Sequence, residues 1–275
     1  KKTIGQYILD VAPEAHAKKA GTPTTGGVFI ILAIIVSSLI TLLMAEKTDN
    51  SALIILTTLF FMALAGFQDD YLKLKGHENR GMSPRGKLLR QILIALIPTL
   101  YAMQMYGTVV ILGSKSFDIG FLYPILAVFV ITGASNAYNL TDGLDGLAIS
   151  VGIPAFIACG IISFLGGHSV VAIVCASAVG ASLGFLKYNK PKAQVFMGDT
   201  GSLALGGLLG TLAILGRCEL LLAIFGGVFV AETLSVIIQV TSFELSGHSE
   251  IRIVKEFTII SALLSALAVL LYIIL

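Results

Sequence analysis

Nine apolar stretches, most about as long as a membrane is thick, follow one another along this chain of 275 residues. A helix needs about 20 apolar residues to cross the hydrocarbon core of a bilayer, and it satisfies its own backbone hydrogen bonds there. The stretches cover residues 27–45, 52–67, 88–106, 121–138, 147–166, 168–186, 200–216, 219–241 and 257–275. Only 12% of the residues are charged, against about 25% in a typical soluble domain. The pattern predicts an all-α polytopic integral membrane protein, a single domain over residues 1–275 with nine transmembrane helices.

The basic residues are distributed unevenly between the two sides that these stretches define. Of the 18 Lys and Arg residues, 15 fall on the side of the N-terminus, and Lys47, Lys115 and Arg217 fall on the other. Loops rich in Lys and Arg remain in the cytoplasm. The N-terminal side is therefore predicted to be cytoplasmic. The outer loop at 107–120, with its β-branched residues and a Gly-Ser-Lys-Ser turn, is expected to form a small hairpin.

Aspartates stand at the predicted cytoplasmic ends of several stretches, where carboxylates close to the membrane are candidates for function. Asp69 and Asp70 end the second stretch, Asp142 and Asp145 lie between the fourth and fifth, and Asp199 begins the seventh. Asp69 and Asp70 would face the unfavourable end of a helix dipole, so a metal ion or the lysines that follow must offset them. Each has an alternative to a functional role. Asp199, taken by itself, is more typical of a helix N-cap. Asp142 and Asp145 are also typical of a tight turn held by Asx hydrogen bonds. Together they predict an active site in a cleft on the cytoplasmic side.

The acidic residues, the basic loops and the glycine-rich turns together indicate phosphoryl transfer. Mg²⁺ prefers one or two carboxylates plus phosphate oxygens, and lysines and the N-terminal amides of a helix receive phosphate. Positioning and charge neutralisation carry most of the rate of such reactions. The sequence contains neither a Walker nor a Rossmann glycine motif, which argues against a nucleoside triphosphate machine.

Two other segments carry lysines beside rigid turns, at residues 16–27 and 187–192. Such lysines are typical either of phosphate binding or of contact with lipid headgroups. Glu232 shares a helix face with Ser235 and Gln239. Hydrogen bonding between helices is the favoured interpretation of that face, and a transporter is the alternative.

Five motifs in order point to one family. They are HAKKAGTPTTGG (16–27), FQDDYLKL (67–74), NLTDGLDGLA (139–148), YNKPKAQVFMGDTGSLALGG (188–207) and AETLSVIIQV (231–240). This series closely resembles the bacterial phospho-N-acetylmuramoyl-pentapeptide transferases, or MraY translocases, over nearly the whole chain. The wider superfamily is that of the polyprenyl-phosphate N-acetylhexosamine-1-phosphate transferases.

The resemblance implies a reaction and its partners. UDP-N-acetylmuramoyl-pentapeptide and undecaprenyl phosphate would give the first lipid-linked peptidoglycan precursor and UMP, with Mg²⁺ as cofactor. The protein would be a multi-pass protein of the bacterial inner (plasma) membrane with its active site facing the cytoplasm. A homodimer is also implied, and no nucleic acid partner is expected.

The resemblance also implies roles for individual residues. Asp69, Asp70 and Asp199 match the essential acidic residues of the family, and Asp199 matches its magnesium ligand. The positions that match its substrate-binding motifs are Lys19, Thr24, Asn139, Asp142, Asp145, Asn189 and Phe196. Phe196 is expected to stack on the uracil ring, and Lys19 to reach its carbonyl oxygens or a phosphate.

Two mechanisms remain open at this point. In the one we favour, Asp69 or Asp70 orients the lipid phosphate, which attacks the β-phosphate directly; a phosphate monoester is already mostly ionised near pH 7. In the other, Asp70 attacks first and forms a covalent phospho-sugar intermediate.

The sequence departs from the family pattern in two places. The family starts with one more span, so ten helices are expected if an N-terminal span precedes Lys1. It also carries a triple-histidine motif between its last two spans, where this sequence reads TSFELSGHSEIRIVKEF. The nearest alternative function is a sibling enzyme that moves N-acetylglucosamine-1-phosphate. The alternative from another class is a transporter or flippase.

Overall fold

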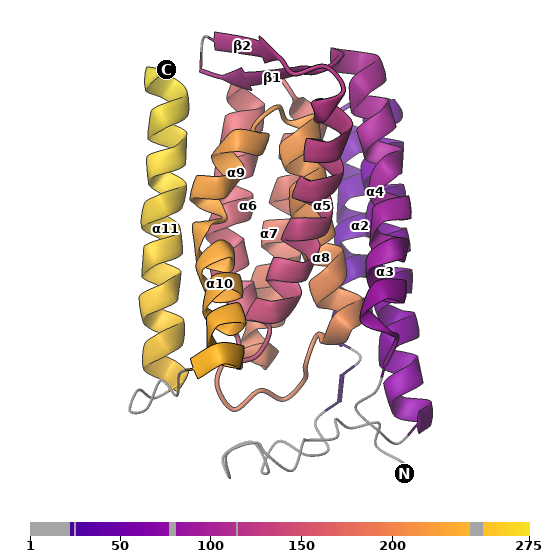
Figure 1. Ribbon diagram of the computed structural model, residues 1–275, viewed down its shortest axis with the longest axis vertical. Helices are drawn as coiled ribbons and strands as arrows, with labels where there is room; N and C mark the ends of the chain where they lie inside the picture. The colour runs from indigo at the N-terminus through magenta and orange to yellow at the C-terminus, as the bar shows by residue number, and fades with distance from the viewer. Residues whose placement is uncertain (1–22, 25, 77–80, 114, 243–249) are drawn as a thin grey trace.

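Long helices that run between the two ends of the molecule make up most of the structure (Figure 1). The computed structural model describes residues 23, 24, 26–76, 81–113, 115–242 and 250–275. The elements are α2 (Gly26–Met44), α3 (Asn50–Gly76), α4 (Pro84–Tyr106), β1 (Val109–Leu112), β2 (Lys115–Asp118), α5 (Leu122–Thr141), α6 (Leu147–Leu165), α7 (Ser169–Asn189), α8 (Gly198–Leu215), α9 (Glu219–Phe225), α10 (Gly227–Ser242) and α11 (Glu250–Ile274). The predicted all-α architecture is confirmed.

Within the described ranges, seven helices are long and apolar enough to cross a membrane: α2, α3, α4, α6, α7, α8 and α11. Helix α5 has polar residues in its last turns, among them Asn136 and Asn139, and falls outside this group. The sequence predicts one span over 219–241, whereas the structure has two helices there, separated at Gly226. Adjacent glycines at 226 and 227 weaken a helix, because they lose the most conformational freedom on ordering. The protein is polytopic, and nine crossings remain a prediction.

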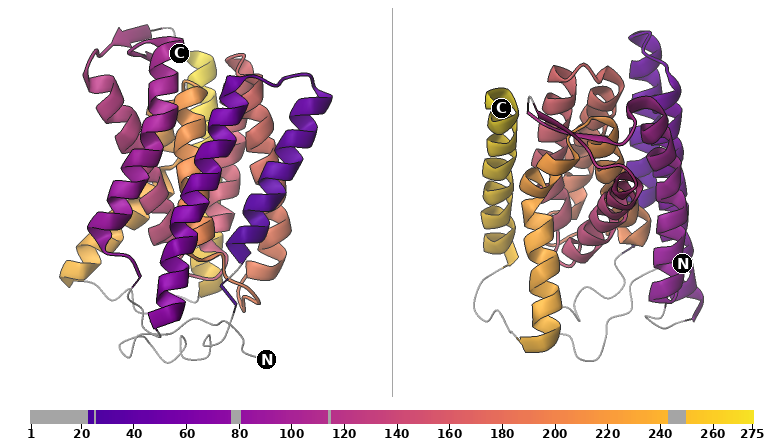
Figure 2. Two further views of the ribbon diagram at one scale, coloured as in Figure 1. Left: turned by 90° about the vertical axis from the view of Figure 1, so that its right-hand side faces the viewer. Right: turned by 45° about the horizontal axis from the view of Figure 1, so that its top comes forward.

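Helix α8 lies at the centre of the bundle, where α2, α3, α4, α5 and α6 pack against it (Figures 1 and 2). In the most apolar 18-residue stretch of α8, 89% is buried inside the protein, whereas the corresponding value for α11, at the edge of the bundle, is 17%. Every residue from Thr200 to Leu215 is buried. A helix that is apolar on all sides is expected at such a position.

Glycines let the neighbours of α8 approach its backbone. Gly27 of α2 lies directly against Gly201, and Gly66 of α3 lies against the backbone of Asp199 and Thr200. Small residues at helix contacts are the usual means of close packing in a membrane. The beginning of α8 is therefore fixed between α2 and α3.

The two ends of the bundle carry different chemistry. At one end α3, α5 and α7 finish and α2, α4 and α8 begin (Figure 1), and the predicted site motifs lie there. At the opposite end β1 and β2 form an antiparallel hairpin in which Val109 pairs with Asp118 and Leu112 with Lys115. The hairpin predicted for 107–120 is confirmed. Because the acidic motifs share one end, their side chains can meet.

Gly66→Ala is expected to force α3 away from α8 and to destabilise the protein by about 1–3 kcal/mol, since overpacking at a close contact cannot relax freely. A Cβ at this position would overlap with the carbonyl group of Asp199. Gly133→Ala on α5 is the matched control, because a Cβ there meets nothing within 4 Å. Thermal unfolding in detergent compares the two variants. Equal stabilities would contradict the close contact between α3 and α8.

Candidate active site

Asp199, in the first turn of α8, is the meeting point of side chains from three other helices. Its Oδ2 atom lies 2.6 Å from Lys87 Nζ of α4 and 3.1 Å from Lys73 Nζ of α3. Its Oδ1 atom accepts a hydrogen bond of 3.2 Å from Asn139 Nδ2 of α5, which also donates to Ser202 Oγ at 2.7 Å. The carboxylate thus has two ammonium groups at one oxygen and an amide at the other.

Asp69 of α3 is held by Lys73 and by the segment that leads into α4. Lys73 Nζ lies 2.6 Å from Asp69 Oδ2, one helical turn further on, and the Met82 backbone N–H donates to Asp69 Oδ1 at 2.7 Å. Gly81 packs so closely here that a Cβ would lie 2.5 Å from Asp69 Oδ1. Lys73 therefore bridges Asp69 and Asp199.

Asp70, the next residue of α3, binds the beginning of α8 instead. Its Oδ1 atom accepts from the backbone N–H of Asp199 at 3.0 Å. Its Oδ2 atom accepts from the backbone N–H of Thr200 at 2.9 Å and from the Thr200 hydroxyl at 2.6 Å. The first N–H groups of a helix have no partner within it, so Asp70 caps α8 from another helix. The alternative that Asp199 is the N-cap is wrong, because α8 begins at Gly198 and Asp199 lies inside its first turn.

Asp69 and Asp70 lie before the end of their helix. The sequence places both at the end of a helix, whereas α3 continues to Gly76. The positive partners that the unfavourable helix dipole would require are nevertheless present. They are Lys73 for Asp69 and the first N–H groups of α8 for Asp70.

Asp142 lies in the turn between α5 and α6, at the edge of this cluster, and is half-buried. Burial, followed by the negative charges of Asp199, Asp70 and Asp145, raises the pKa of its carboxyl group well above the usual value. Several carboxyl groups therefore act on the same small region. A cation that enters there would relieve their repulsion.

Asp145 and Asn189 are buried and hold the loop that precedes α8. Asp145 Oδ2 accepts from the backbone N–H groups of Lys192 at 3.2 Å and Ala193 at 3.0 Å, and Asn189 Nδ2 donates to the Val195 carbonyl at 2.9 Å. Lys192 has a φ of 71°, a backbone conformation that is rare for lysine. These two partners of Asp145 lie on a neighbouring loop, so Asp145 links the turn between α5 and α6 to the loop before α8.

Phe196 joins this loop to the segment before α2. Its backbone N–H donates to the Pro23 carbonyl at 2.8 Å, and its own carbonyl accepts from the Gly26 N–H at 3.0 Å. The Phe196 side chain is half-buried, as is Thr24 in the paired segment. Lys19 lies outside the described residues. The structure thus links Asp69, Asp70 and Asn139 to Asp199, Asp69 through the shared Lys73 and the other two by hydrogen bonds. The remaining described candidates lie on the neighbouring loops and at the end of α7.

Lys87 and Thr200 are contact residues that sequence reasoning did not single out. Lys87 lies one turn after the beginning of α4, where Ser83 caps the helix by accepting from the Gly86 N–H. Its place in the first turn of a helix was the one signal in the sequence that could have singled it out. Lys87 is, however, one of many basic residues on the predicted cytoplasmic side. Thr200 carried no signal beyond its place in the motif GDTGS.

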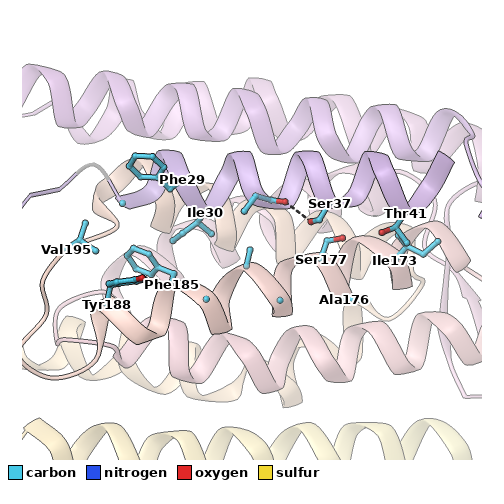
Figure 3. A pocket seen from close by; sticks show the side chains of 15 residues that line it. Phe29, Ile30, Ser37, Thr41, Ile173, Ala176, Ser177, Phe185, Tyr188 and Val195 are labelled. Carbon is cyan, nitrogen blue, oxygen red and sulfur yellow. Dashed lines mark hydrogen bonds between the residues drawn. The ribbon is translucent and has the colours of Figure 1, made fainter. Parts of the chain in front are cut away.

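A groove of about 870 Å³ lies between α2 and α7 and reaches Val195 of the loop before α8 (Figure 3). Apolar and small side chains line it, including Phe29, Ile30, Ile173 and Phe185. None of the described aspartates and lysines of the cluster contributes to its lining. The groove is therefore not the place of the acidic chemistry, and the predicted cytoplasmic cleft remains a prediction.

Comparison with known proteins assigns the chain to a family. The model of glycosyl transferase family 4 matches residues 52–217. The chain is 44% identical over 286 residues to the phospho-N-acetylmuramoyl-pentapeptide-transferase of Bacillus licheniformis, which covers 97% of this chain and 88% of that protein. The corresponding protein of Bacillus mycoides is 42% identical over 98% of this chain and 89% of its own length. The phospho-N-acetylmuramoyl-pentapeptide-transferase of Shouchella clausii is 44% identical over 92% of this chain and 78% of its own length.

The chain belongs to the phospho-N-acetylmuramoyl-pentapeptide-transferase family. The resemblance inferred from the sequence motifs is confirmed. The family-model match runs from α3 to the turn after α8 and so includes Asp69, Asp70, Asn139 and Asp199. In this member of the phospho-N-acetylmuramoyl-pentapeptide-transferase family, the acid–lysine cluster is built entirely from that matched segment.

Asp145→Ala is expected to destabilise the protein by about 1–3 kcal/mol, because it removes the buried carboxylate that accepts the part-buried backbone N–H groups of Lys192 and Ala193. Asp145→Asn keeps an acceptor oxygen and is expected to cost less. Thermal unfolding measures both, and hydrogen exchange of the Lys192 and Ala193 amides reports the loop directly. Unchanged exchange in Asp145→Ala would contradict this role.

Proposed function

We propose that this protein transfers phospho-N-acetylmuramoyl-pentapeptide from its UDP donor to undecaprenyl phosphate, which gives the first lipid-linked peptidoglycan precursor and UMP. Its similarity to proteins named phospho-N-acetylmuramoyl-pentapeptide-transferase supports this assignment. The observation that carries the chemistry is the convergence of Lys73 and Lys87 on Asp199 at the beginning of α8. Ammonium groups suit the phosphates of a nucleotide-linked sugar.

The proposed reaction exchanges one phosphoanhydride bond for another. An oxygen of the lipid phosphate forms a bond to the β-phosphorus of the donor. The bond from that phosphorus to the oxygen bridging the two phosphates breaks, and UMP leaves with the electron pair. The lipid phosphate is already mostly ionised near pH 7, so it needs no general base. The role of Asp69 is therefore to orient the attacking phosphate. Lys73 and Lys87 neutralise charge on the diphosphate, which is the main requirement of phosphoryl transfer.

Mg²⁺ is the proposed cofactor, and the donor set fits it. Among the described residues no three His, Cys, Asp or Glu side chains stand close enough to hold a metal ion together. Mg²⁺ does not need such a cluster, because proteins bind it through one or two carboxylates plus substrate phosphates. Asp199 would hold it, with Asp69 nearby through their shared Lys73. The ion would stabilise the charge that develops on the transferred group and on UMP.

The remaining candidates are assigned to the donor. Phe196 would stack on the uracil ring, and Lys19 would reach its carbonyl oxygens or a phosphate. The residues proposed to line the uridine and sugar site are Thr24, Asn139, Asp142, Asp145 and Asn189. The half-buried side chain of Phe196, close in sequence to Asp199 and tied to the segment before α2, supports this arrangement.

The proposed location is the bacterial inner membrane, with the site facing the cytoplasm. Seven described helices of membrane length and composition support a multi-pass protein. The positive-inside bias supports a cytoplasmic site, because Lys73, Lys87 and Lys187 share the end that carries the cluster, whereas Lys115 and Arg217 lie near the hairpin. The homodimer implied by the family resemblance is kept as part of the proposal.

The deciding experiment is UMP release by purified protein in detergent with undecaprenyl phosphate and Mg²⁺. UDP-N-acetylmuramoyl-pentapeptide and UDP-N-acetylglucosamine are offered in parallel. Release with the muramoyl donor alone supports the proposal. Release with the glucosamine donor alone moves the protein to the sibling activity, and no release from either, regardless of EDTA, favours a transporter.

Asp199→Asn is expected to lower Mg²⁺-dependent UMP release about 100- to 1,000-fold, the usual cost of losing a group that stabilises developing charge. The change keeps the side chain's size but removes the charge that faces Lys73 and Lys87. Asp118→Asn in the exposed hairpin is the control. Activity is measured over a range of Mg²⁺ concentrations, with thermal unfolding to confirm folding. Wild-type turnover in Asp199→Asn would remove this residue from the mechanism.

Phe196→Ala is expected to weaken binding of uridine nucleotides about tenfold, since stacking on a base contributes about 1–3 kcal/mol. Binding of the lipid should change much less. Phe164→Ala, at an exposed position on α6, serves as the control. Calorimetric titration with UMP gives the affinities, and equal affinities for wild type and Phe196→Ala would refute the stacking role.

A further inference from the structure

The carboxylate of Asp70 is engaged at both of its oxygens by the beginning of α8. Oδ1 accepts from the Asp199 N–H at 3.0 Å, and Oδ2 accepts from the Thr200 N–H at 2.9 Å and the Thr200 hydroxyl at 2.6 Å. Asp69, one residue earlier, is engaged by a lysine and by the loop before α4. The two adjacent aspartates therefore have different hydrogen-bond partners.

We propose that Asp70 is a positioning residue, which caps α8 across the helix–helix contact and thereby sets the place of the Asp199 carboxylate, and that it is not the nucleophile of the reaction. This inference rests on the proposed function and specifies the part that one of its three aspartates plays.

The beginning of α8 depends on this cap. The residue before the helix is Met197, whose side chain makes no cap hydrogen bond of the kind that Ser, Thr, Asp or Asn makes at that position. Gly198 follows with a φ of 66°, and a Cβ on it would lie 2.7 Å from Asp70 Oδ2. Only glycine adopts this conformation without strain and also leaves room for the carboxylate. The local sequence is thus adapted to a cap that comes from α3.

The cap acts on the chemistry through one residue. The N–H group that Asp70 Oδ1 accepts belongs to Asp199 itself. The Asp199 carboxylate in turn holds Lys73 and Lys87 at 3.1 Å and 2.6 Å. A shift of the Asp70 carboxylate would therefore shift the acid that is proposed to hold the metal ion, together with the lysines proposed for the diphosphate.

A nucleophilic role would require Asp70 to give up these bonds. An attacking carboxylate oxygen must present a lone pair to phosphorus, whereas charge-assisted hydrogen bonds to backbone N–H groups stabilise the ionised oxygen where it stands. Release of the oxygen would also leave the first N–H groups of α8 without partners at a half-buried place. The geometry favours direct attack by the lipid phosphate for this reason.

The first test compares Asp70→Asn with Asp70→Ala. Asn is as good an N-cap as Asp, whereas Ala is a poor one. Asp70→Asn is expected to lower kcat only about tenfold, because one acceptor oxygen and the cap remain. Asp70→Ala is expected to lose about 100-fold or more, as for the loss of a preorganised group. Equal and complete loss in both variants would overturn the proposal, since neither can act as a nucleophile.

A second pair of variants, Thr200→Val and Thr200→Ser, tests the positioning role if Asp70→Ala does not fold. Val has the shape of Thr without the hydroxyl that donates to Asp70 Oδ2, and Ser keeps that donor. Thr200→Val is expected to lower kcat with an unchanged KM for the donor, and Thr200→Ser to resemble wild type. An unchanged or raised kcat in Thr200→Val would contradict the positioning role, because loss of a hydrogen bond makes a carboxylate more nucleophilic.

The second test looks for the covalent species in wild-type protein and does not depend on turnover. The protein is treated with phosphatase to remove residual lipid phosphate, and it is then given donor labelled at the β-phosphorus without acceptor. The expected result is neither UMP release nor label on the protein after acid quenching. Label on Asp70, with one UMP released per protein, would overturn the inference. Wild type that stays inactive with every donor and acceptor would instead overturn the proposed function.

Discussion

The first turn of α8 must satisfy its N–H groups at a point where three helices leave little room for water, and the structure around it follows from that requirement. Asp70 of α3 accepts these N–H groups, which requires α3 to lie close. The close approach requires Gly66, and the shape of the turn requires Gly198. Two glycines from separate segments and one acid thus determine where the central helix begins.

The charges of the site follow from the same arrangement. Once α8 begins beside α3, the Asp199 carboxylate lies within reach of Lys73 on α3 and Lys87 on α4. Taking a carboxylate out of water is costly unless it is paired and hydrogen-bonded. Asn139 from α5 supplies the remaining hydrogen bond. Four helices are therefore joined through one side chain, at the end of the bundle where the loops are basic.

Much of this could be predicted from the sequence, and the exceptions have physical reasons. Apolar length predicts the helices, and acids at helix ends predict the cluster, because both signals are local. The cap on α8 could not be predicted, since its acceptor lies 129 residues before Asp199 in the chain. Lys87 was missed because a lysine on a basic side has no signature of its own. The break at Gly226 was missed because membrane helices often tolerate glycine.

The sharing of Asp199 Oδ2 by two lysines has a consequence for selectivity. The protein supplies its own counter-ion for both ammonium groups, so an incoming anion has to displace an internal partner rather than fill an open positive site. We expect a diphosphate to displace both contacts more readily than a single phosphate does, because it can pair one lysine with each of its phosphate groups. We expect such self-pairing to discriminate against small anions and to favour ligands with two adjacent phosphates.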